Sequence, residues 1–175
     1  AIEEDKDGNI WVATRGGGAF IYDGENFINI TDHNGLSSNA LFSLFKDSNN
    51  IMWIGGGGLN KYYGEGFRHL SASNGLIHDV VFPIIEDKNG NMWIGTEGGL
   101  SYLDQTTGEI KNYSMEDGLS DNGITSILET SSGDIWVTTQ TGLNKLVGDK
   151  FVQHPKYDDV ELWSITEAKD GDIWI

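Results

Sequence analysis

Short runs of apolar and polar residues, separated by turns, follow one another along the whole chain. The stretch from residue 80 to 113 shows the pattern most clearly. Its β-branched and aromatic runs cover residues 80–86, 92–96, 100–103 and 110–113, and the segments between them are rich in Gly, Asn, Asp and Thr. Such runs predict four short antiparallel strands joined by turns. No stretch keeps an apolar period of 3.6 residues long enough for an α-helix, so the predicted fold is all-β.

The same pattern recurs about every 40 residues. A turn motif such as Asp-Gly-Asn-Ile-Trp ends five times in a tryptophan, at Trp11, Trp53, Trp93, Trp136 and Trp174. A second motif, Asn-Gly-Leu or Asp-Gly-Leu, recurs at 34–36, 74–76 and 117–119. Four-stranded units with this period are typical of β-propeller blades. The predicted blades are 1–33, 34–73, 74–116 and 117–157, with the start of a fifth at 158–175, which makes about four and a half blades.

One proline indicates which strand of a blade lies at an edge. Pro83 falls in the middle of the first strand of its repeat, where a central strand would lose a ladder hydrogen bond. We therefore expect the first strands to be sheet edges that line the central channel. The position after Pro83 is apolar in every repeat, as in Ile2 and Ile84, and is predicted to pack between blades. Trp163, which shares the repeat position of Phe42, is predicted to lie in the core.

The turn before each tryptophan has two interpretations. As a structural turn it needs a positive φ angle, which Gly8, Gly90, Gly133 and Gly171 can adopt and for which Asn50 can substitute. As a calcium loop it would use alternating ligands such as Asp5, Asp7 and Asn9. Later copies carry too few carboxylates for calcium. The structural turn is therefore the favoured interpretation.

Charge and composition exclude several classes of function. The chain carries 11 Lys and Arg against 27 Asp and Glu, a net charge of −16, and would repel nucleic acid and anionic lipid surfaces. The absence of cysteine excludes disulfides, thiolate zinc sites and cysteine nucleophiles. No run of about 18 apolar residues is present, so no membrane span or direct membrane contact is predicted from this segment. No cofactor is predicted either.

Candidate binding residues follow from the order of the strands. The loop between the second and third strands and the linker to the next blade emerge at the same end of a blade, which is the usual ligand entrance of a propeller. The predicted ligand-binding residues there are Arg15, Ser38, Asn39, His78, Glu97, Asp121, Asn122 and Gln140. They differ between repeats while the framework is constant, which favours recognition. Neutral drift at solvated loops would produce the same variation.

Groups that could carry out catalysis are few. No serine has a base at a fixed offset, and the glycine-rich stretches lack the Lys-Ser/Thr of a phosphate loop. We predict no catalytic residue and no metal site. The alternative is a metal-assisted lyase or hydrolase in which His33 and His78, from successive linkers, bind a metal or act as acid and base. If the ligand is a sugar, the acidic rim favours a neutral one unless a local basic pocket exists.

Motif and period together resemble a known family. The segment from Ile84 to Leu100, Ile-x-Glu-Asp-x-x-Gly-Asn-Met-Trp-Ile-Gly-Thr-x-Gly-Gly-Leu, and the Asp-Gly-Leu-Ser at 117–120 are similar to the two-component regulator propeller repeat. The resemblance covers essentially the whole chain. It implies seven-bladed propellers in the periplasmic sensor regions of bacterial hybrid histidine kinases, often regulators of polysaccharide use.

The resemblance also sets expectations about function. It implies a non-catalytic sensor that binds an oligosaccharide or another protein, with the kinase elsewhere in the protein and a homodimer of the full-length receptor. The enzyme alternative has its analogue in virginiamycin B lyase, a propeller enzyme. Because four and a half blades do not close a ring of seven, we expect the chain to be part of a longer protein.

Overall fold

The computed structural model describes all residues 1–175 and consists of antiparallel sheets joined by turns. Four sheets have four strands each, paired in chain order, and a two-stranded sheet follows. They are blade 1 with β1 (Ile2–Glu4), β2 (Ile10–Ala13), β3 (Ala19–Tyr22) and β4 (Phe27–Ile30); blade 2 with β5 (Leu41–Lys46), β6 (Met52–Gly56), β7 (Gly58–Tyr62) and β8 (Phe67–Leu70); blade 3 with β9 (Val81–Glu86), β10 (Met92–Thr96), β11 (Gly99–Leu103) and β12 (Ile110–Tyr113); blade 4 with β13 (Ile124–Glu129), β14 (Ile135–Thr139), β15 (Gly142–Val147) and β16 (Lys150–Gln153); and half-blade 5 with β17 (Thr166–Glu167) and β18 (Ile173–Trp174). The predicted four and a half propeller blades are confirmed.

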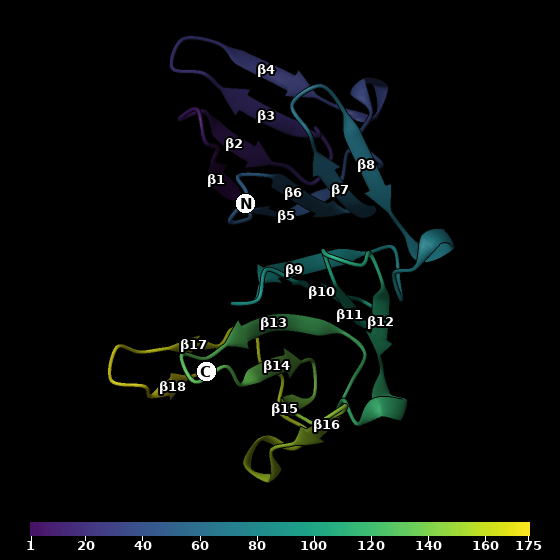
Figure 1. Cartoon of the computed structure of the whole chain (residues 1–175), viewed down its shortest axis with the longest axis vertical. Helices are drawn as coiled ribbons and strands as arrows, with labels where there is room; N and C mark the ends of the chain where they lie inside the picture. The colour runs from purple at the N-terminus through teal and green to yellow at the C-terminus, as the bar shows by residue number, and fades with distance from the viewer.

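The sheets fan out along an arc, with the N- and C-terminus on its concave side (Figure 1). The first strands β1, β5, β9 and β13 lie toward that side and contact one another in order. Strand β9, which contains Pro83, is the edge strand of its sheet. The predicted position of the first strand is therefore correct.

Apolar side chains between neighbouring sheets form the core. One cluster joins blades 1 and 2, the next joins blades 2 and 3, and the third joins blades 3 and 4. Ile84 is buried between its blade and the preceding one, as predicted. Ile2 occupies the same repeat position but is 71% exposed, because no sheet of this chain covers that side of blade 1. The prediction for Trp163 is wrong, since its side chain is 70% exposed.

The turn before each tryptophan is a hydrogen-bonded hairpin. Asn50 has φ 60° and Gly90 has φ 82°, so the predicted backbone conformation is confirmed. The aspartate six residues before the indole accepts backbone N–H groups with one oxygen, and with the other it accepts the indole Nε1–H. The Asp–Trp distances are 2.9 Å for Asp5–Trp11, 2.8 Å for Asp47–Trp53 and 3.2 Å for Asp87–Trp93. In these three repeats the carboxylate therefore holds the indole.

A single turn of 3-10 helix precedes each new blade, and the Gly-Leu motif ends the first three of these turns, whereas Asp158 follows the fourth. The four turns are η1 (Asp32–Asn34), η2 (Ala72–Asn74), η3 (Met115–Asp117) and η4 (Pro155–Tyr157). Gly118 follows η3 with φ 99°, and a side chain there would collide with the Phe151 carbonyl oxygen. The next residue, Leu119, is buried between blades 3 and 4. The motif thus turns the chain sharply and anchors the start of the following blade.

A buried polar side chain on the third strand fixes each linker. Asn60 Oδ1 accepts the N–H of Ser37 at 2.8 Å, and Asn144 Oδ1 accepts that of Ser120 at 2.9 Å. In blade 3 the Ser101 hydroxyl performs the same role. Because all three side chains are buried, each hydrogen bond also satisfies a group that would otherwise be costly to bury.

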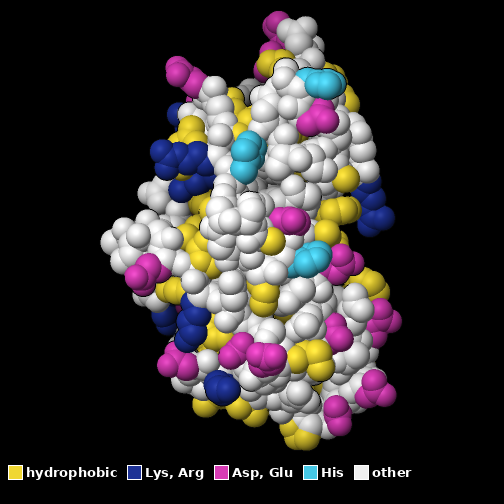
Figure 2. Space-filling model, turned by 90° about the vertical axis from the view of Figure 1, so that its right-hand side faces the viewer, with side chains coloured by type: hydrophobic (Ala, Val, Ile, Leu, Met, Phe, Trp, Pro, Cys, Tyr) yellow, Lys and Arg dark blue, Asp and Glu magenta, His cyan; other side chains and the backbone are white.

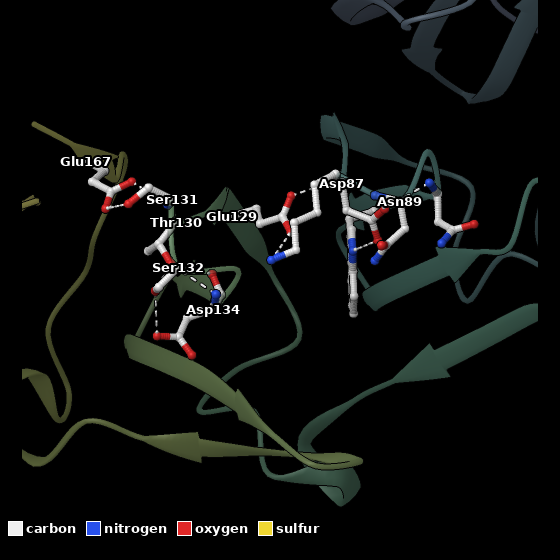
Figure 3. Close-up of polar contacts among 11 residues, drawn as sticks. Asp87, Asn89, Glu129, Thr130, Ser131, Ser132, Asp134 and Glu167 are labelled. Atoms are coloured by element: carbon white, nitrogen blue, oxygen red, sulfur yellow. Dashed lines mark hydrogen bonds and ion pairs between the residues drawn. The ribbon is translucent and has the colours of Figure 1, made fainter. Parts of the chain in front are cut away.

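A second repeated contact, which we call the glutamate clasp, joins neighbouring blades at the opposite end of the sheets (Figure 3). Glu86 accepts the N–H and hydroxyl of Ser48 at 2.6 and 2.7 Å. The other two clasps are Glu129 with Lys88 and Glu167 with Ser131. At the junction between blades 1 and 2 the corresponding residues are Lys46 and Lys6. That junction has no clasp.

Acidic side chains are distributed widely over the convex side of the arc, with few basic ones between them (Figure 2). They do not gather into one patch in this view. No helix in the structure is both long and apolar enough to cross a membrane.

Candidate functional site

The predicted linker residues fall into two groups with repeated structural roles. In the first group each side chain accepts the N–H of the residue two positions later. These pairs are Ser38 with Ala40, His78 with Val80, and Asp121 with Gly123, at 3.0, 3.1 and 2.7 Å. Such contacts shape the backbone where a linker enters the next first strand. One acceptor atom of each of these candidates is therefore engaged in the turn.

The second group holds the 3-10 turns. Asn39 Oδ1 accepts the N–H of Asp32 at 2.8 Å, and Asn122 Oδ1 accepts that of Met115 at 2.9 Å. Asp79 makes the equivalent contact in the linker before blade 3. The amide nitrogen of Asn122 makes no hydrogen bond within the chain, so that side chain keeps two donors for a ligand. The Asn39 side chain instead also interacts with the Asp32 carboxyl and holds its pKa below the usual value.

The remaining predicted residues stand four positions after a tryptophan, in the loop between second and third strands. Arg15, Glu97 and Gln140 are all exposed, and none of their side chains makes a hydrogen bond within the chain. Their backbone is fixed: Arg15 forms a bridge with Ala40, and the Gln140 N–H donates to the Gly123 carbonyl. These three side chains therefore project from a rigid loop without an internal partner.

A cavity of about 460 Å³ lies among the first strands, and we call it the axial cavity. Arg15 is the one predicted binding residue that lines it. Side chains from β5 and β9 form much of the remaining wall, including Phe42, Ser43, Phe82 and Pro83. Its volume falls within the range of small-molecule sites. The sequence predicts Phe42 to lie in the core. The only indication that its side chain lines the cavity is the edge position of the first strand.

A second cavity, of about 410 Å³, lies at the opposite end of the sheets, where blades 1 and 2 meet without a clasp. Its apolar floor includes Trp11, Ile21 and Tyr62, and its rim includes Asp7 and Asn49. Hydrogen bonds from Trp11 and Asn9 counter the effect of burial on Asp5 and hold the pKa of that carboxyl below its usual value. The carboxylate of Asp5 is therefore committed to the turn and not to a ligand.

The two histidines of the enzyme alternative are in different surroundings. His33 is an exposed residue whose ring lies 3.9 Å from the Asp32 carboxylate. His78 uses Nδ1 to accept the Val80 N–H and packs beside Gly98. No group of three or more His, Asp or Glu side chains is arranged to hold a metal ion. The structure places neither histidine in the axial cavity wall.

The chain matches other proteins both in sequence and in fold. The profile of the family described as two component regulator propeller matches residues 1–16, 35–58, 75–98 and 118–141, about half of the chain. These segments contain the tryptophan hairpins of the four complete blades and all eight predicted binding residues. No curated protein matches the sequence.

Among solved structures, the extracellular domain of the hybrid two component system BT3049 from B. thetaiotaomicron is similar, with a TM-score of 0.82 and 24% identity over 99% of this chain. The corresponding domain of BT4673 from the same organism gives 0.81 and 22% over 99%. Virginiamycin B lyase from Staphylococcus aureus gives 0.71 and 16% over 99%.

The chain spans about a quarter of the two extracellular domains, 26% and 27%, and 61% of the lyase. At these identities the three structures share the fold. The sequence profile goes further, because its matches recur in phase with the blades: each includes the tryptophan hairpin, and three begin at the linker motif. The chain belongs to the two-component regulator propeller family.

Proposed function

We propose that this propeller is a non-catalytic sensor module in the extracytoplasmic region of a hybrid two-component regulator. The observation that carries the proposal is the family match, which recurs in all four complete blades. The two similar extracellular domains of hybrid two component systems support it. Binding of a ligand to the loops or the axial cavity would change how the blades pack, and the change would pass to a kinase elsewhere in the protein.

The location and partners belong to the same proposal. In a bacterium with two membranes, this segment would lie in the periplasm as part of a membrane-anchored receptor that forms a homodimer. The ligand would be an oligosaccharide, from a glycan that the cell uses, or another protein. No observation favours the metal-assisted lyase or hydrolase, because His33 and His78 share no site with a third ligand.

The proposal is tested by a thermal-shift screen of the propeller against oligosaccharides and divalent metals. A ligand that binds only the folded state raises Tm by mass action. The expected result is a saccharide-dependent rise that the H33A/H78A variant retains, together with ligand-dependent autophosphorylation of the full-length regulator. Metal-dependent turnover of a saccharide, abolished in H33A/H78A, would contradict the sensor proposal.

A further inference from the structure

The axial cavity differs electrically from the rest of the molecule. No Asp or Glu lines it, although the chain carries a net charge of −16. Arg15 is the cationic side chain in its wall, which also includes Ala1 with its terminal ammonium group, and no carboxylate lies within 4.0 Å of the Arg15 guanidinium. An unpaired guanidinium offers a planar fork of N–H donors that matches a carboxylate or sulfate. The cavity is therefore a local basic pocket in an acidic protein.

The cation is a feature of blade 1 and not of the repeat. The positions equivalent to Arg15 in the next three blades are Gly57, Glu97 and Gln140. The chain has one other arginine, Arg68 on the outer strand β8, which stacks on Tyr63 at 5.3 Å. A framework role shared by all blades thus does not explain Arg15.

Aromatic side chains line the cavity beside the cation. The rings of Phe42 and Phe82, from neighbouring first strands, lie 5.2 Å apart at an angle of 45°. The same repeat position is Thr125 in blade 4 and the exposed Trp163 before half-blade 5. The Thr125 hydroxyl donates to the Leu162 carbonyl at 2.6 Å, which brings the segment with Trp163 next to the first strand of blade 4. An apolar surface suited to stacking therefore runs beside the cation.

One hydroxyl near the cavity has no partner. Ser43 Oγ is buried, and it is the buried side-chain oxygen or nitrogen of the chain that makes no hydrogen bond. Buried polar groups are almost always paired, and an exception calls for an explanation. The Oγ lies close to Gly55, on the side of the sheet that packs against Val81 and Ile84 of blade 3, so it faces the interior between blades and not the cavity.

We propose that the axial cavity binds a small ring compound that carries a carboxylate or sulfate group. The acidic group binds Arg15, and the face of the ring packs on Phe42 and Phe82. This inference rests on the proposed sensor function and names the class of ligand for it. A neutral sugar was expected only in the absence of a local basic pocket. The axial cavity supplies such a pocket, so the proposed ligand is acidic.

Two pairs of probes separate the acidic group from the kind of ring. Glucuronate is compared with glucose, and benzoate with benzyl alcohol, by titration calorimetry on the whole chain. We expect each acid to bind and its neutral partner to bind about tenfold more weakly or not at all, because an ionic hydrogen bond is lost. Binding of glucuronate alone indicates a sugar acid, and binding of benzoate alone indicates an aromatic acid.

The variants are R15Q and its matched control R68Q, which removes the other arginine. We expect R15Q to weaken binding of the acid about tenfold or more and R68Q to leave it unchanged. F42A should weaken binding of the same acid without changing the preference for the acid over its neutral partner. Circular dichroism melts of each variant separate a lost site from a lost fold.

The inference is overturned if R15Q binds the acids as tightly as the original chain, or if neither acid binds. Two further outcomes distinguish a failure of this inference from a failure of the sensor proposal. Binding of a neutral oligosaccharide that is indifferent to R15Q leaves the sensor in place with its site elsewhere. Failure of every ligand to bind or to change autophosphorylation removes the sensor proposal as well.

Discussion

The residue six positions before a tryptophan decides how its indole is held. In blades 1 to 3 it is an aspartate that binds the indole nitrogen, and in blade 4 it is Thr130, which accepts the Asp134 N–H and leaves the Trp136 nitrogen without this contact. A lysine covers two of these rings: Lys61 Nζ lies 4.5 Å from the Trp53 ring centre, and Lys145 Nζ lies 5.3 Å from that of Trp136. Trp53 is therefore fixed both at its edge and on its face.

Replacing Asp47 with alanine should be strongly destabilising. Its carboxylate is buried and accepts the Trp53 Nε1–H at 2.8 Å and two backbone N–H groups of the turn. The variant leaves these donors unpaired, so we expect a loss of about 2–4 kcal/mol in the free energy of unfolding. Urea denaturation measures it. The reverse change, T130D, supplies a partner for Trp136 and should stabilise the chain; equal losses in both variants would contradict this account.

Acid should weaken the first hairpin in a defined range of pH. Burial raises the pKa of Asp5, but hydrogen bonds from Trp11, Asn9 and Asp7 outweigh this effect, so the folded-state pKa lies below 3.8. The stabilisation is present above about pH 3.8 and is lost as the pH falls below it, because the unfolded chain takes up the proton first. Tm measured from pH 5 to 3 should fall.

The matched variants for this pH series are D5N and D7N, in the same turn. Asp7 accepts no hydrogen bond with its side chain, whereas Asp5 accepts several. D5N should show a smaller loss of Tm below pH 4 than the original chain, and D7N should follow the original curve. An unchanged acid limb in D5N would show that other carboxylates control it.

At the scale of elements, the junctions between blades 2 and 3 and between blades 3 and 4 are built from the same three parts. They are the leucine after the 3-10 turn, the buried amide or hydroxyl that fixes the linker, and the glutamate clasp. The clasp at the junction of blades 2 and 3 consists of Glu86 and Ser48, and the junction of blades 1 and 2 has Lys46 and Lys6 instead. At that junction Lys46 stands in place of the glutamate of the clasp, and Lys6 stands in place of the residue that donates to it.

Lys46→Glu should create the missing clasp. The new carboxylate would accept the Lys6 N–H and lie near its ammonium group, as Glu129 does with Lys88. We expect a gain of about 1 kcal/mol, which is about 2–4 °C in Tm for a chain of this size. K46Q is the control, since it removes the repulsion of like charges without adding a negative acceptor. An equally large rise in Tm in K46Q would show that the gain comes from removing the charge alone.

The repeat made most of these elements predictable from the sequence. The runs at 80–86, 92–96, 100–103 and 110–113 differ from β9 to β12 by at most one residue at an end. The 3-10 turns were missed because three residues leave no periodic apolar pattern. The aspartate–indole contact was missed as well, although the constant spacing of six residues was its signal.

The candidate site was less predictable, because exposure depends on the neighbouring blade. Phe42 and Phe82 cover each other, whereas the blade next to Trp163 offers Thr125, which is too small to cover an indole. The sequence placed Arg15 at the loop end of blade 1 but could not place it beside two aromatic rings. Ser38 and Asp121 each accept the N–H of the residue two positions later. This contact is a turn pattern that spacing alone suggests.

At the scale of the whole molecule, the arc has two uncovered sheet faces. Blade 1 exposes Ile2, and half-blade 5 exposes Trp174 at 66%. Within the arc the equivalent residues Ile84 and Trp93 are buried between blades. Open repeat arrays need their terminal faces covered.

We therefore expect the 175-residue chain to self-associate as its concentration rises. Sedimentation velocity between about 5 and 200 μM should show the weight-average mass increasing, because the uncovered apolar faces pack together. The I2N/W174S variant should shift this increase to higher concentration, and F27S, on the outer strand β4, is the control at an exposed apolar residue away from the first strands. A monomer at every concentration with one sharp melt would contradict the prediction.

The unequal environments of five of the six tryptophans divide the fluorescence of the molecule into a shielded and an exposed population, and the half-buried Trp136 lies between them. Trp11, Trp53 and Trp93 are buried and bound to carboxylates, so iodide or acrylamide in solution cannot reach them in the folded state. Trp163 and Trp174 are open to solvent. The quenchable part of the emission therefore reports on the concave side and the open end of the arc, while the unquenched part reports on the junctions between blades. A single cuvette can thus follow an event at the axial cavity and the integrity of the fold at the same time.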